Sequence, residues 1–115
     1  MTSDDFKKRT KAFALRVIRL VDSLPRSRTA GTIGGQLLRV GTSVGANYRA
    51  ACRARSSADF ISKMGIVEEE CDESAYWMEL LIEAGIMKES RVSDLLSEAN
   101  GILAMVIASI KTSRK

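Results

Sequence analysis

The chain has 115 residues, of which 45% are hydrophobic and 28% charged, the balance of one folded domain spanning residues 1–115 rather than of a disordered chain. It contains no histidine, which excludes Ser-His-Asp and Cys-His nucleophile systems and nearly all zinc sites. The formal net charge of +4 is unevenly spread: residues 1–57 carry 12 basic and 3 acidic side chains, a net +9, whereas residues 58–115 carry 6 and 11, a net −5.

The first predicted element is a helix from about Ser3 to Leu24. Apolar residues recur along it at alternating spacings of four and three, as on the core-facing side of a bundle helix. Asp4 and Asp5 lie in the first turn, where the helix dipole favours anions, and Pro25 ends the helix. Its predicted core stripe consists of Phe6, Thr10, Phe13, Val17, Leu20 and Leu24.

The second predicted helix begins between Thr29 and Thr32 and ends near Arg55. Each glycine in a helix interior costs up to about 1 kcal/mol relative to alanine, so we expect its glycines to permit close approach of a neighbouring helix. These glycines are Gly34, Gly35, Gly41 and Gly45. The predicted core stripe is Ile33, Leu37, Val40, Val44, Asn47 and Ala51.

The third predicted helix starts at a capping signature formed by Ser56 and Asp59 and stops at Gly85. Its core stripe runs through Phe60, Met64, Val67, Cys71, Ser74, Met78 and Leu81. The fourth helix extends from about Ser90 to Thr112, with Val92, Leu95, Leu96, Ala99, Ile102, Leu103, Val106 and Ile110 facing inward. No alternating β pattern competes, so the sequence predicts an all-α, antiparallel up-down-up-down four-helix bundle.

No catalytic, cofactor or metal site is expected. The third helix is rich in carboxylates, but carboxylate di-metal bundles also need Glu-x-x-His motifs, so a solvated or ion-paired acidic face is the simpler interpretation. Cys52 and Cys71 are most simply small buried hydrophobes. We therefore expect a protein that is not an enzyme.

The cellular location follows from the cysteines and the N-terminal residues. Two cysteines do not make a disulfide framework, which favours a reducing compartment. The first residues lack the apolar stretch of a signal peptide, and no apolar run approaches the roughly 18 residues of a membrane span. The expectation is a cytoplasmic protein without a membrane partner.

Basic residues gather on and around the second helix, and no acidic residue occurs between Asp22 and Asp59. Lys7, Lys8, Arg9 and Lys11 add positive charge at the start of the first helix. A surface of this kind can neutralise phosphates, and the lack of interleaved aromatic residues favours contacts with a nucleic-acid backbone. The alternative is that the arginines pair with carboxylates of the third helix in the same or a neighbouring subunit. The candidate phosphate-binding residues are Arg26, Arg28, Arg39, Arg49 and Arg53.

Two further features point to self-association. The second half of the third helix is apolar nearly all round, which in a small bundle predicts burial against a neighbouring subunit. The candidate oligomer-interface residues are Ile66, Trp77, Leu80 and Ala84. Asn47 lies in a core stripe, and a buried asparagine commonly fixes register or oligomeric state at a cost in stability.

Three stretches carry a family resemblance. The run Gln36 to Ala50 resembles the second-helix signature of the four-helix bundle proteins related to the ribosomal-RNA intervening-sequence protein. The run Ser56 to Met64 resembles that family's entry into the third helix. The Glu-rich, Tyr-Trp-containing part of that helix is similar through Glu69, Glu73, Ser74, Tyr76, Trp77, Leu80 and Leu81.

The resemblance has implications for assembly and partners. The family includes the accessory variability protein of diversity-generating retroelements, a ring-shaped homopentamer of bundles that binds nucleic acid and a reverse transcriptase. The resemblance thus implies a homo-oligomer, a pentamer by analogy, with RNA or DNA and a reverse transcriptase as candidate partners. Many members carry a glutamate shortly after the asparagine of this motif, where the present chain has Ala50.

Two functions remain after these exclusions. The first is a non-enzymatic nucleic-acid-binding or ribonucleoprotein accessory module that uses the basic face of the first two helices. The second is a protein-interaction scaffold whose arginines form intersubunit ion pairs. Arginines free at the surface favour the first, and arginines bridged to Glu69, Glu70 or Glu73 favour the second.

Overall fold

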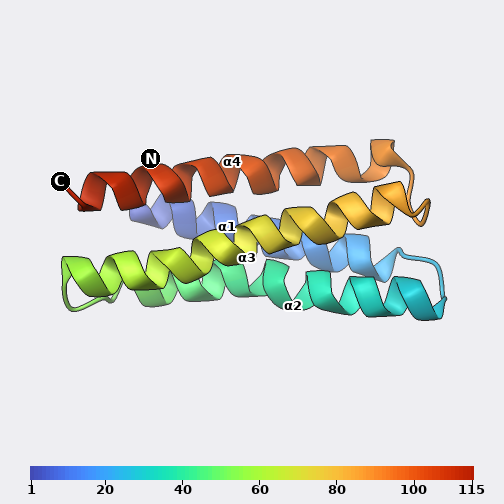
Figure 1. Cartoon of the computed structure of the whole chain (residues 1–115), viewed down its shortest axis with the longest axis horizontal. Coiled ribbons are helices and arrows are strands. Elements are labelled where there is room, and N and C mark those ends of the chain that lie inside the picture. The colour runs from blue at the N-terminus through green and yellow to red at the C-terminus, as the bar shows by residue number, and fades with distance from the viewer.

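Four helices account for almost the whole of the computed structural model, which describes residues 1–115. They are α1 (Ser3–Asp22), α2 (Arg28–Ala51), α3 (Ser57–Glu83) and α4 (Glu89–Ser113). Successive helices run in opposite directions and are joined by short loops, so the predicted up-down-up-down bundle is confirmed (Figure 1). The bundle is a rod with extents of 45 × 21 × 20 Å.

The helix ends follow local capping chemistry. Ser56 caps α3 as predicted, because its hydroxyl accepts a hydrogen bond from the Asp59 amide at 3.0 Å. Gly85 ends α3 with a φ of +72°, a left-handed conformation that favours glycine. The second helix ends earlier than predicted, at Ala51 rather than near Arg55, because the chain must turn before the Ser56 cap.

The core is built from the predicted stripes, except that some of the α2 residues that face the core differ from the predicted ones. The side chains of α2 that are buried include Leu37, Val40 and Val44, as predicted. At the end of the stripe, however, Tyr48 is buried and Asn47 is only half-buried. The buried position Gly34 likewise takes the place predicted for Ile33. The inward face of α2 is therefore displaced by one residue at these two positions, whereas Ala51, the last residue of the predicted stripe, is buried as predicted.

Close packing at glycines explains this displacement. A β-carbon at Gly41 would lie 2.9 Å from both γ-carbons of Val17, and one at Gly45 would lie 3.1 Å from the Thr10 hydroxyl. Gly34 is similarly close to Leu24, so three of the four predicted close approaches are confirmed. The fourth, at Gly35, is wrong, because no atom lies within 4 Å of its would-be β-carbon.

The seam between α1 and α4 is the least closely packed in the bundle. A bidentate ion pair crosses it: Arg9 Nε and Nη2 each donate to a Glu98 carboxylate oxygen at 2.9 Å. Gly101 leaves room for this guanidinium, because a β-carbon there would lie 2.8 Å from Nη2. The hydrogen bond from Arg9 holds the pKa of Glu98 below its ordinary value of 4.5.

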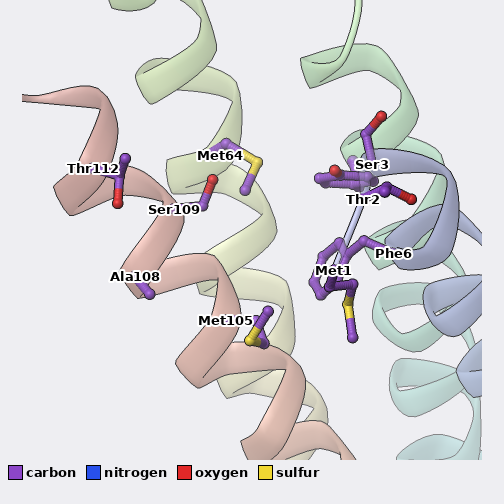
Figure 2. A pocket seen from close by; sticks show the side chains of 10 residues that line it. Met1, Thr2, Ser3, Phe6, Met64, Met105, Ala108, Ser109 and Thr112 are labelled. Carbon is purple, nitrogen blue, oxygen red and sulfur yellow. The ribbon is translucent and has the colours of Figure 1, made fainter.

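A cleft of about 200 Å³ opens at the end of this seam where both chain termini lie (Figures 1 and 2). Figure 2 shows the first residues of α1 on one side and the last turns of α4 on the other, with Met64 of α3 behind them. The walls combine apolar side chains with hydroxyl groups, those of Ser109 and Thr112 among them. Thus α1 and α4 are held together in the middle and separated at this end.

Helix α4 is long and apolar enough to cross a membrane by length and composition, with a mean hydropathy of 1.3 over its most apolar 18 residues. The segment is not an uninterrupted apolar run, because charged and polar residues such as Glu98 and Asn100 divide it. In the bundle, the buried residues of α4 form one stripe within the core, and 28% of that window is buried.

Candidate nucleic-acid interface

The five predicted phosphate-binding arginines do not form one cluster. Arg26 lies in the loop before α2 and Arg28 is its first residue. Arg49 lies near the other end of α2, about 32 Å farther along the helix axis. Both groups are exposed, but they occupy opposite ends of the rod.

Arg39 lies between these groups and is paired within the chain. Its Nη2 atom is 3.2 Å from Glu73 Oε2 and 3.0 Å from Gln36 Oε1. The side chains of Arg39 and Glu73 are 60% and 41% exposed, so this surface pair adds at most about 1 kcal/mol to stability. The other four predicted arginines form no ion pair in the structure.

A basic groove, here called the α1/α2 groove, brings Arg49 together with Lys7 and Lys11. Because α1 and α2 are antiparallel, the start of α1 lies beside the end of α2 (Figure 1). The groove has a volume of about 220 Å³ and its lining includes no acidic residue. Its remaining lining residues are small: Thr10, Ala14, Thr42, Gly45 and Ala46.

Arg53 lies in the turn just after the end of α2 and borders a second hollow at the corner between α2 and α3. Arg55, Asp59 and Lys63 also line this hollow. Asp59 is already engaged, because its carboxylate accepts from Lys63 Nζ at 2.7 Å and from the Arg55 amide at 3.2 Å. These hydrogen bonds hold the pKa of Asp59 below its ordinary value. The guanidinium groups of Arg53 and Arg55 form no ion pair, so this corner also carries unpaired positive charge.

Asn47 has a polar partner on α3 rather than an apolar environment. Its Nδ2 atom donates a hydrogen bond to Glu70 Oε1 at 2.6 Å, and its side chain is half-buried. The expectation of a buried asparagine is therefore wrong about burial. Desolvation raises the pKa of Glu70 above 4.5, although the hydrogen bond from Asn47 and the charge of Arg39 act in the opposite direction.

The predicted interface residues form an outward stripe on α3. Ile66 is 48% exposed and Ala84 is exposed, whereas Trp77 and Leu80 are half-buried. The Trp77 indole N–H donates to Glu73 Oε2 at 3.0 Å, and the edge of the Tyr76 ring packs against the indole with 5.1 Å between centroids. Tyr76 itself is 52% exposed, an outward aromatic residue that helical spacing alone did not distinguish.

The residues with nucleophilic or metal-binding potential are poorly placed for chemistry. Burial raises the pKa of the Cys71 thiol to about 12, so the thiolate is disfavoured at neutral pH. Burial also raises the pKa of Tyr48, with a further contribution from its hydrogen bond to Cys52. The structure brings no three His, Cys, Asp or Glu side chains into an arrangement that could hold a metal ion.

Comparison with known proteins agrees with the four-helix fold. The family profile described as 23S rRNA-intervening sequence protein matches residues 4–108. A solved structure from Bacteroides thetaiotaomicron, a protein of unknown function from the S23 ribosomal protein family, is 34% identical to the chain. The match covers 96% of this chain and 99% of that one, with a TM-score of 0.89. No curated protein matches the chain. The profile match and the shared bundle together show that the chain belongs to the 23S rRNA-intervening sequence protein family.

Proposed function

We propose that this protein is a non-enzymatic, homo-oligomeric accessory module that binds the phosphate backbone of RNA or DNA through the α1/α2 groove. The observation that carries the proposal is the groove itself. Lys7, Lys11 and Arg49 line it, none of them forms an ion pair, and no carboxylate shares the lining. Unpaired cations along a groove favour phosphate contacts, which are independent of base sequence.

The charge distribution supports the same function. The groove and the α2–α3 corner are formed mainly by the part of the chain with a net charge of +9, whereas the acidic residues belong mostly to α3 and α4. A polyanion would therefore approach the α1/α2 side of the bundle and be repelled by the carboxylates of α3.

A protein-interaction scaffold is the second candidate, and two observations favour it. Arg39 is bridged to Glu73, and the outward stripe with Ile66 and Trp77 leaves apolar surface exposed on a single chain. Burial of this stripe between subunits would form the homo-oligomer, with five subunits by analogy to the family. The two functions are compatible in one assembly, because the stripe lies on α3 and the groove lies between α1 and α2.

Salt-dependent binding of a single-stranded RNA tests the proposed function. For the wild-type protein we expect micromolar affinity at low salt, and log affinity that falls linearly with log salt by about 0.7 to 0.9 per neutralised phosphate. The triple variant Lys7→Gln/Lys11→Gln/Arg49→Gln should flatten this slope by about two to three units, because each phosphate contact contributes about one.

The matched control removes the same charge at the opposite end of the bundle. Arg26→Gln/Arg28→Gln/Lys88→Gln changes three exposed cations, so a slope that flattens equally in both variants would show dependence on net charge alone. Arg39 is left unchanged because it is already paired. An intact wild-type oligomer that binds no RNA at low salt would contradict the proposal and favour the scaffold.

A further inference from the structure

The α1/α4 seam contains an arginine-lined hollow that the nucleic-acid function does not use. It lies where the last turns of α1 meet the first turns of α4, at the end of the seam opposite the cleft of Figure 2. Its volume is about 320 Å³, and three of its lining residues are Arg16, Arg19 and Arg91. The apolar lining residues, Leu20 and Leu95, are buried and belong to the core.

The positive charges in this hollow are only partly compensated. Asp94 is its one acidic lining residue, and it forms no ion pair with any of the three arginines. The nearby carboxylate of Glu98 is held by Arg9 across the seam. Three guanidinium groups and one carboxylate leave the hollow with a net charge of +2.

One free hydroxyl group and a helix end add hydrogen-bond donors. Ser23 and Ser90 line the hollow. The Ser23 hydroxyl donates to the Leu20 carbonyl oxygen at 2.7 Å, whereas the Ser90 hydroxyl forms no hydrogen bond in the structure. Lys88, the residue before α4, provides no side-chain cap, so the first turn of α4 presents backbone N–H groups without a capping side chain. The positive end of the α4 dipole adds to the attraction for an anion.

We propose that this hollow, here called the α1/α4 site, binds a phosphate monoester. A monoester carries a charge of about −1.5 to −2 at pH 7, which matches the net charge of the site better than the single charge of a carboxylate or a phosphodiester does. Guanidinium groups bind phosphate oxygens in bidentate pairs, so arginines from two helices can hold one group from two sides. The hollow is larger than a phosphate ion, and the remaining space accommodates the group esterified to it.

The α1/α4 site is independent of the α1/α2 groove, because the two share no residue. The monoester has two sources, a free nucleotide-sized metabolite or the 5′-phosphate at the end of a nucleic-acid strand. Calorimetric titration with adenosine 5′-monophosphate, with adenosine as its matched control, tests the first source. An oligonucleotide with a 5′-phosphate, compared with the same strand ending in a 5′-hydroxyl, tests the second.

Variants that are expected to weaken monoester binding, and one that is expected to strengthen it, make the test specific. Arg16→Gln and Arg91→Gln should each weaken monoester binding about tenfold or more, because each removes hydrogen bonds from a charged donor. Asp94→Asn should tighten it by up to about fivefold, because it removes the opposing charge. Arg26→Gln, an exposed arginine outside the hollow, should leave binding unchanged.

The outcomes separate this site from the groove. Preference for the monoester over adenosine, or for the 5′-phosphorylated strand alone, supports the α1/α4 site and identifies its source. The Lys7→Gln/Lys11→Gln/Arg49→Gln protein should retain this preference even where it loses RNA binding. Equal binding of phosphorylated and unphosphorylated ligands would overturn the proposal. So would folded Arg16→Gln and Arg91→Gln proteins that bind the monoester as the wild type does.

Discussion

Two glycines of α2 should respond in opposite ways to the same substitution. Gly35→Ala places a methyl group in open space, because no atom lies within 4 Å of the β-carbon position. Gly41→Ala places it 2.9 Å from both γ-carbons of Val17 and 3.3 Å from the Val17 β-carbon. Ordinary contacts between carbon atoms are about 3.5 to 4.0 Å, so the second methyl group overlaps its neighbour.

The expected magnitudes follow from two contributions to the free energy of unfolding. Both substitutions raise helix propensity by about 0.5 to 1 kcal/mol, so this contribution cancels when the variants are compared. Val17 is fully buried and β-branched, so it cannot rotate away, and overpacking of this kind costs about 1 to 3 kcal/mol. Gly35→Ala should therefore be more stable than Gly41→Ala by about 1 to 3 kcal/mol, or about 4 to 12 °C in Tm.

Thermal and urea unfolding followed by circular dichroism measures this difference, at one protein concentration so that any oligomer contributes equally. Combining Val17→Ala with Gly41→Ala should cost less than the sum of the two single changes, because the smaller side chain removes the overlap. A Gly41→Ala protein at least as stable as Gly35→Ala would refute the reasoning and show that α1 can move away from α2 at little cost.

Two further predictions concern α3. Trp77→Ala and Leu80→Asp should shift a wild-type oligomer to smaller species in light scattering with helical content retained, since loss of an interface tryptophan costs about 2 kcal/mol or more. Leu38→Asp, at an exposed position on α2, is the control. A wild-type protein that is monomeric at micromolar concentration would contradict the proposed interface. Glu70→Gln should be more stable than wild type at pH 7, with the difference shrinking below about pH 4. The folded state raises the pKa of Glu70 and so favours the protonated carboxyl group. The contribution of Glu70 to the free energy of unfolding therefore falls as pH rises from 4.5 through that raised pKa. Urea unfolding at the two pH values measures this effect, and a difference that is the same at both would rule out titration of Glu70 as its cause.

The sequence was sufficient for the helices because hydrophobic period, caps and glycine stops all agreed. Ser56 and Gly85, for example, mark the ends of α3 by chemistry that operates within a few residues. The inward face of α2 was harder to predict. Its orientation is set by contacts at Gly34 and Gly41, and glycine has no side chain to register in a hydrophobic pattern. For this reason the hydrophobic pattern placed Asn47 in the core, whereas the structure buries Tyr48.

The candidate site was only partly predictable for a different reason. A helical wheel gives the angle of Arg28 and Arg49 around α2 but says nothing about their separation along the axis. Their distance of about 32 Å divides the predicted cluster. Lys7 becomes the partner of Arg49 only once α1 is laid antiparallel to α2, and the α1/α4 hollow requires residues more than 70 positions apart in the chain.

The loose α1/α4 seam also bears on how the chain folds. The closest packing in the bundle joins helices that are adjacent in sequence, whereas the seam joins the two ends of the chain with few contacts. Most of the native structure can therefore form by closing short loops, one helical hairpin after another, and little of it awaits the slow meeting of the termini. By the same reasoning, the amide hydrogens of α1 and α4 should exchange with solvent before those of α2 and α3, because the outer helices can open without disturbing the central pair.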